Sequence, residues 1–171
     1  MHPRLARAMI NLSGKTSGMI LDPFCGSGGL LVEALFLGFE VTGIDNDQTM
    51  IQRCEVNLRH YGFPQENYKL LFQDALIYTK KADAVVADVP YGKNTKGRDL
   101  GRLYFHFLQH YRTLTSVMVV GFPHFILVEP LIKKTNWKIS AEFEYYLHKS
   151  LSKKIYVLSR RYSRSPRLSN T

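Results

Sequence analysis

The chain has 171 residues, of which 45% are hydrophobic and 22% charged, a composition typical of one globular domain. No apolar run approaches the roughly 20 residues of a membrane span, and no apolar segment follows the first charges as in a signal peptide. The two cysteines, Cys25 and Cys54, match neither a disulfide framework nor the spacing of a zinc site. We therefore expect reduced thiols, no metal and a cytoplasmic protein.

The net charge of +9 is concentrated in the last third of the chain. Residues 133–171 contain ten lysines and arginines against two glutamates, whereas residues 1–132 carry a net charge of only +1. A basic terminal third is typical of proteins that bind nucleic acid, although a solvated, solubilising surface has the same composition.

Apolar strand patterns alternate with helical patterns along most of the chain, which predicts βαβ units and a parallel sheet. The expected strands cover residues 19–21, 40–44, 68–72, 82–87 and 117–121. The expected helices cover residues 3–12, 29–37, 47–61, 103–114 and 125–134, the last with Pro130 inside it. Two further strands, 137–148 and 153–161, are joined by a connection so short that they must pair antiparallel.

These elements predict an α/β domain over residues 1–161, followed by a basic, disordered tail over 162–171. A mostly parallel seven-stranded sheet that ends in an antiparallel hairpin resembles the Rossmann-like fold of S-adenosylmethionine (SAM) methyltransferases. This resemblance implies a cofactor class but no substrate. A nicotinamide oxidoreductase is disfavoured, because Gly26-Ser27-Gly28-Gly29-Leu30-Leu31 lacks the third glycine of the dinucleotide-binding pattern.

Four of the expected strands end at or near an aspartate, and ligands of open α/β sheets bind beyond these carboxyl ends. Such carboxylates suit a ligand with hydroxyls, amines and a positive centre, and they repel a pyrophosphate. The glycine-rich turn lets the backbone approach the ligand, and the amides of the helix that follows can hold its carboxylate. In SAM, we expect Asp22 to bind the ammonium, Asp45 to accept hydrogen bonds from the ribose hydroxyls, and Asp74 to bind the adenine amine. The residues expected to bind SAM are Asp22, Pro23, Phe24, Gly26, Gly28, Asp45, Asn46, Asp74 and Ala75.

The sequence Asp88-Val89-Pro90-Tyr91 resembles the Asp/Asn-Pro-Pro-aromatic motif of enzymes that methylate nucleobase amines or glutamine amides. Residues 22–28 are similar to the cofactor loop of these enzymes, and residues 2–12 to the segment that leads into it. Residues 90–95, followed by Leu103-Tyr104, resemble the archaeal-eukaryotic tRNA guanosine-N2 methyltransferases that act at position ten. The resemblance extends over residues 2–160.

The resemblance implies that Asp88 and the Val89 carbonyl accept hydrogen bonds from the amine, while Tyr91 stacks on a flipped base. We therefore expect a catalytic set of Asp88, Val89, Pro90 and Tyr91. Val89 replaces the first proline of the motif, so it keeps the carbonyl but loses the fixed φ angle. Basic side chains near this motif and on the hairpin are expected to contact RNA phosphates, namely Lys93, Lys96, Arg98, Lys153, Lys154 and Arg160.

The resulting prediction is a SAM-dependent RNA methyltransferase whose acceptor is guanosine N2 in tRNA. The alternatives are a DNA adenine-N6 methyltransferase, a protein glutamine-amide methyltransferase, or a non-catalytic nucleic-acid-binding subunit with this fold. Family members commonly carry a THUMP-containing RNA-binding region before the segment that begins here at His2-Pro3. We therefore expect either a catalytic fragment or a separate RNA-recognition subunit.

Overall fold

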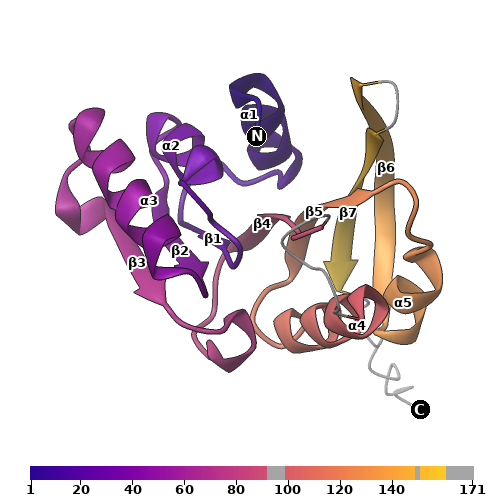
Figure 1. The fold of residues 1–171 in the computed structure, drawn as a ribbon. Helices are drawn as coiled ribbons and strands as arrows, with labels where there is room; N and C mark the ends of the chain where they lie inside the picture. The colour runs from indigo at the N-terminus through magenta and orange to yellow at the C-terminus, as the bar shows by residue number, and fades with distance from the viewer. Residues whose placement is uncertain (92–98, 149–150, 161–171) are drawn as a thin grey trace, which may run out of the picture.

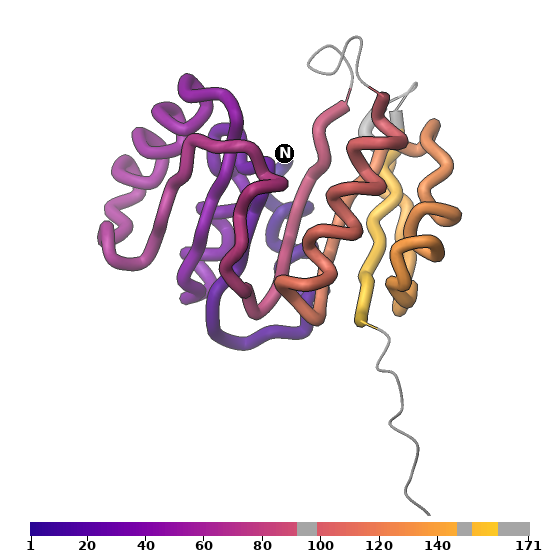
Figure 2. The backbone as a smooth tube through the Cα atoms, turned by 90° about the horizontal axis from the view of Figure 1, so that it is seen from below, coloured from indigo at the N-terminus to yellow at the C-terminus, as the bar shows by residue number. Residues whose placement is uncertain are grey.

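The computed structural model describes residues 1–91, 99–148 and 151–160, and it places one seven-stranded sheet at the centre of these residues (Figures 1 and 2). The spatial order is β3-β2-β1-β4-β5-β7-β6, with the first five parallel and β7 antiparallel to both β5 and β6. The strands are β1 (Met19–Asp22), β2 (Glu40–Asp45), β3 (Tyr68–Phe72), β4 (Ala84–Asp88), β5 (Val117–Pro123), β6 (Trp137–His148) and β7 (Leu151–Arg160). The predicted fold class is therefore confirmed.

Helices cover both faces of the sheet, which explains why β4 and β5 are apolar without alternation. In Figure 1, α1 and α2 lie above the sheet, whereas α4 and α5 lie below it. The helices are α1 (Pro3–Leu12), α2 (Gly29–Phe36), α3 (Gln48–His60), α4 (Leu100–Tyr111) and α5 (Glu129–Lys134), with 3-10 turns η1 (Gln65–Asn67) and η2 (Ala75–Ile77).

Two apolar clusters hold these layers together, one on each face of the sheet. The first contains buried side chains of α1, α2 and α3, and the second contains those of α4 and α5. An ion pair of 2.7 Å between Arg7 and Glu33 joins α1 to α2, and the Trp137 indole donates to the Leu108 carbonyl at 2.9 Å. In the part of the chain that the structure describes, no helix has the length and apolar character needed to cross a membrane.

The predicted boundaries differ from the observed ones mainly in two helices. The expected helix over 125–134 is wrong in its first turn, because α5 begins only at Glu129. Pro130 therefore lies in the first turn, where its missing N–H costs no helical hydrogen bond. In contrast, α4 begins three residues before the expected start, because Asp99 caps it by accepting from the Arg102 amide at 3.0 Å.

Candidate active site

A cavity of about 510 Å³ lies at the carboxyl edge of the sheet, beyond the ends of β1, β2 and β4. Residues from both of the predicted motifs line it, so the glycine-rich turn and the end of β4 face one space. Its lining consists of Pro23, Phe24, Gly26, Asp45, Asn46, Asp47, Met50, Asp74, Ala75, Leu76, Asp88, Pro90 and Leu103. Among the residues that the structure describes, this lining carries four carboxylates and neither lysine nor arginine, so the charge of these residues suits a cation and opposes a pyrophosphate.

The turn after β1 is held against the end of β2 by Asp45. One carboxylate oxygen of Asp45 accepts from the Gly26 amide at 2.9 Å, and the other accepts from the Asp47 amide at 2.9 Å. Gly26 has a φ of 52°, and a Cβ added there would meet no atom within 4 Å, so this position is open. A carboxylate accepts about four hydrogen bonds, so Asp45 keeps capacity for ligand hydroxyls.

The turn after β3 is held in place by α4. Asp74 caps η2 by accepting from the Leu76 amide at 2.8 Å. The buried Tyr111 hydroxyl donates to the Ala75 carbonyl at 2.6 Å, and His110 Nε2 lies 2.6 Å from the Tyr78 carbonyl oxygen. These contacts fix the backbone of the turn, and Asp74 lines the cavity with one carboxylate oxygen engaged by the Leu76 amide.

Two of the residues predicted to bind SAM do not line the cavity. Asp22 is only 1% exposed and accepts from the Phe24 amide at 3.0 Å. Burial raises the pKa of Asp22 well above its ordinary value, and the neighbouring carboxylates of Asp88 and Asp45 add to this rise. Gly28, with a φ of 88°, packs against α3, because a Cβ there would lie 2.5 Å from Cys54 Sγ. Its role is thus close packing of the turn.

The predicted acceptor end of the cavity is formed by Asp88, whose carboxylate pairs with the ammonium of Lys153. Lys153 is 3% exposed and comes from β7, two strands away from β4. Its Nζ also lies 5.0 Å from the centroid of the Tyr91 ring. Burial raises the pKa of Asp88 above its ordinary value, while the charge and hydrogen bond of Lys153 oppose this rise.

Val89 stabilises the end of β4 in a way that a proline could not. Its amide donates to the Gly121 carbonyl at 3.2 Å, which extends the pairing of β4 with β5 by one residue. The Val89 residue is 1% exposed, so its side chain belongs to the core. The Tyr104 hydroxyl donates to the Pro90 carbonyl at 2.9 Å. These two bonds restrain the turn, although Val89 lacks the fixed φ angle of the motif proline.

Of the predicted RNA-contacting cations, the three that the structure describes are not gathered in one place. Lys93, Lys96 and Arg98 lie outside the described residues. Lys153 is buried against Asp88, so its position does not fit the predicted contact with an RNA backbone. Arg160 lies at the opposite edge of the sheet, where it donates to the Thr115 carbonyl at 2.9 Å.

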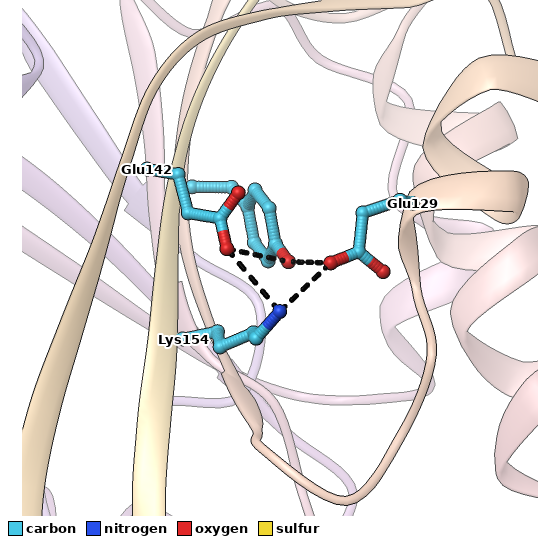
Figure 3. Close-up of polar contacts among 4 residues, drawn as sticks. Glu129, Glu142 and Lys154 are labelled. Atoms are coloured by element: carbon cyan, nitrogen blue, oxygen red, sulfur yellow. Dashed lines mark hydrogen bonds and ion pairs between the residues drawn. The ribbon is translucent and has the colours of Figure 1, made fainter.

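Lys154, the remaining predicted cation, belongs to a polar network between α5 and the hairpin (Figure 3). Its Nζ lies 2.9 Å from Glu129 and 3.3 Å from Glu142. The buried Tyr156 hydroxyl donates to the same Glu129 oxygen at 2.5 Å. Lys154 therefore has a structural role on the face of β7 opposite to Lys153.

Several features of the site were not predicted from the sequence. The cavity is also lined by Asp47, Met50, Leu76 and Leu103, and Asp88 is paired with Lys153. Met50 follows the helix-capping Asp47 by three residues, so helical spacing could have placed it beside the ligand. Strand alternation could have placed Lys153 with Ile155, facing the core rather than the solvent.

Comparison with known proteins agrees with this geometry. Residues 1–153 match the family model described as "RMKL-like, methyltransferase domain". The chain is 39% identical over 168 residues to a tRNA (guanine(10)-N2)-dimethyltransferase of Methanothermobacter thermautotrophicus, covering 94% of this chain and 49% of the relative. A Pyrococcus abyssi protein of the same name is 34% identical over 166 residues, with 93% and 50% covered.

Solved structures share the fold at low sequence identity. Magnesium protoporphyrin IX methyltransferase from Synechocystis, solved with bound SAM, has a TM-score of 0.74 and 14% identity, covering 92% of this chain and 79% of that one. The present chain spans about half the length of the two archaeal relatives. From the match over residues 1–153, the chain belongs to the RMKL-like methyltransferase domain family.

Proposed function

We propose that this chain transfers a methyl group from SAM to the N2 amine of guanosine in tRNA. The observation that carries the proposal is the single cavity shared by the glycine-rich turn and Asp88. The names of the two archaeal relatives support guanosine N2 as the acceptor and tRNA as the substrate.

The residues of the cavity fit SAM as the cofactor. Its carboxylates complement a sulfonium, and Asp45 and Asp74 keep acceptor capacity for ribose hydroxyls and an adenine amine. Phe24, Met50 and Leu76 provide apolar walls for a planar ring. When bound, SAM supplies an electrophilic methyl group. Asp22 is assigned to the support of the turn, because its carboxylate is buried behind the lining.

The end of β4 is suited to align a nucleobase amine. The lone pair of such an amine is delocalised into the ring, so the nitrogen is a poor nucleophile. Hydrogen bonds from its two protons to Asp88 and to the Val89 carbonyl favour a pyramidal nitrogen, with its lone pair directed at the methyl group. The negative charge of Asp88 stabilises the positive charge that develops on nitrogen, and alignment supplies much of the remaining rate enhancement. Tyr91 stacks on the extruded base.

RNA recognition needs more surface than the cavity offers. We propose that the basic terminal third contacts RNA phosphates, a role supported by its net charge alone. We also propose that a THUMP-type domain or subunit supplies further RNA recognition, because this chain spans about half of its archaeal relatives.

The proposal is tested by incubating the chain with methyl-labelled SAM and total tRNA that lacks the modification. After digestion to nucleosides, we expect the label in N2-methylated guanosine. Asp88→Ala is the matched variant, because it removes the acceptor carboxylate and leaves Asp45 and Asp74 in place. Label in another nucleoside, or tight SAM binding without transfer to any RNA, would contradict the proposed acceptor.

A further inference from the structure

Lys153 is the one charged side chain of the described residues that reaches the acceptor carboxylate by an ion pair. It starts at β7, opposite Pro123 of β5, while Asp88 lies opposite Gly121 of β5. The lysine side chain therefore crosses β5 to reach β4. A Cβ built on Gly121 would lie 3.4 Å from Asp88 Oδ1 and 3.9 Å from Lys153 Cδ. Both side chains thus pass over β5 beside Gly121.

The two carboxylate oxygens of Asp88 have different surroundings. Oδ2 accepts from Lys153 Nζ, whereas Oδ1 is buried and has no hydrogen-bond partner among the described residues. A buried acceptor without a partner is unfavourable, so the burial of this carboxylate depends on the ion pair that Oδ2 makes. Asp88 lines the cavity and its side chain is 22% exposed, but Oδ1 contributes almost nothing to that exposure.

We propose that Lys153 is a positioning residue for methyl transfer, which keeps Asp88 ionised and fixes the carboxylate that accepts a hydrogen bond from the substrate amine. Because its ammonium also lies against one face of Tyr91, Lys153 orients the ring whose other face stacks on the base. This inference rests on the proposed function, since it assigns a role within that reaction.

The role follows from the cost of burying a lone charge. Asp88 is largely buried, and a carboxylate without a counter-charge in such surroundings takes up a proton instead. A protonated Asp88 offers no negative charge to the developing ammonium. The other titratable groups that face Asp88 are Asp22, Tyr104, Tyr91 and the amino group of Met1. The charge of Lys153 and, more weakly, that of the Met1 amino group lower the pKa of Asp88, and of these two groups Lys153 is the one that pairs with it directly.

The first test measures the titration midpoint of the Asp88 carboxyl by carbon-13 NMR, which requires no tRNA. In Lys153→Met we expect the midpoint to rise by about 1 to 3 pH units, because an opposite charge at this range lowers a carboxyl pKa by that amount. Lys153→Arg keeps the charge and should keep the midpoint within about half a unit. Lys154→Met, the neighbour on the opposite face of β7, is the matched control and should leave it unmoved. An unmoved midpoint in Lys153→Met overturns the proposal.

The second test measures single-turnover methyl transfer against pH. In Lys153→Met we expect the rate at pH 7 to fall at least tenfold, with SAM affinity within about twofold and the half-maximal rate shifted to higher pH. Lys153→Arg should restore most of the rate and the original pH profile. If Lys153→Met unfolds, the Asp88→Asn/Lys153→Met double variant removes both charges, and its recovered stability would show that the single variant failed through the unpaired carboxylate.

The two proposals fail in different ways. A wild-type chain that binds SAM but transfers no methyl group at any pH overturns the proposed function, and the positioning role with it. An active wild type together with a Lys153→Met variant of unchanged rate and pH profile overturns the positioning role alone.

Discussion

The cofactor half and the acceptor half of the cavity are built in different ways. Around the cofactor half, the aspartates at or just after the ends of β1, β2 and β3 each accept a hydrogen bond from an amide two residues further along the chain; these pairs are Asp22–Phe24, Asp45–Asp47 and Asp74–Leu76. In the acceptor half, Asp88 is paired with Lys153, which lies 65 residues away in the sequence. The cofactor half is thus built from local turns that β2 and α4 hold in place, and the acceptor half from the packing of β4, β5 and β7.

This difference separates binding from reactivity. The hydrogen bonds of the three aspartates at the strand ends do not involve β6 or β7. The affinity for the cofactor should therefore tolerate substitutions in β7. The charge of Asp88 depends on Lys153 of β7, so a substitution of Lys153 should slow the reaction. Variants in the two halves should therefore affect different measured quantities.

The largest effect is expected for Asp88→Ala. Removal of a preorganised charge from the reacting centre costs about 100- to 1000-fold in rate. Because Asp88 lies at the acceptor end, SAM affinity should stay within a few-fold. Single-turnover transfer and calorimetric SAM titration measure the two quantities, and an equal loss of both would remove Asp88 from the acceptor role.

Asp45→Ala should show the converse behaviour. Loss of hydrogen bonds from a carboxylate to ribose hydroxyls should weaken SAM binding about 10- to 100-fold, since each bond to a charged group contributes about 1.5–3 kcal/mol. Asp83→Ala is the matched control, because Asp83 accepts from the Met19 amide at 2.8 Å at the other edge of the sheet. Calorimetry should show normal SAM affinity for the control, and normal affinity in Asp45→Ala would refute the ribose assignment.

A smaller effect is expected for Tyr104→Phe, which removes the donor to the Pro90 carbonyl. The free energy of unfolding should fall by about 1 kcal/mol, as for a typical hydrogen bond. We expect transfer to slow several-fold with SAM affinity unchanged, because the turn after Asp88 loses a restraint while the cofactor turns keep theirs. Weakened SAM binding in this variant would show that the two halves are coupled.

The smallest effect concerns stability rather than the reaction. The hydrogen bond from the Tyr156 hydroxyl, helped by Lys154, lowers the pKa of Glu129 from 4.5 to about 2 (Figure 3). A carboxyl whose pKa is lower in the folded state stabilises the fold at any pH above its unfolded-state pKa. This stabilisation is lost as the pH falls from the unfolded-state pKa to the folded-state pKa. The stability advantage of wild type over Glu129→Gln should therefore shrink between about pH 4.5 and pH 2.

Chemical denaturation across this pH range measures that advantage. The exposed Glu144 on β6 provides the control, because Glu144→Gln should leave the pH dependence as in wild type. A constant difference between wild type and Glu129→Gln over the whole range would contradict the account of this network.

The sequence predicted most of the sheet because its signals are local. Apolar runs, glycine turns and terminal aspartates gave each parallel strand and the place of the cavity. Pro130 was interpreted as a defect within a helix, although it marks the helix start. Where this helix begins depends on how residues 125–128 pack, and the spacing of apolar residues gives no information on that packing.

The acceptor site was predicted only in part, for a physical reason. The roles of Asp88 and Tyr91 came from a motif, but the partner of Asp88 depends on strand order and on a side chain crossing β5 at Gly121. Likewise, Val89 was seen only as a missing proline, since its hydrogen bond to β5 requires knowledge of that neighbour. Long-range pairing of this kind leaves no periodic trace in the sequence.

The central claim is that the cavity joins the methyl donor to an exocyclic amine. It is tested most directly with two tRNA transcripts that are identical except for guanosine or inosine at position ten, since inosine lacks only the amine. In single-turnover assays with labelled SAM, we predict transfer to the guanosine transcript and none to the inosine transcript. Equal labelling of both transcripts would contradict the account.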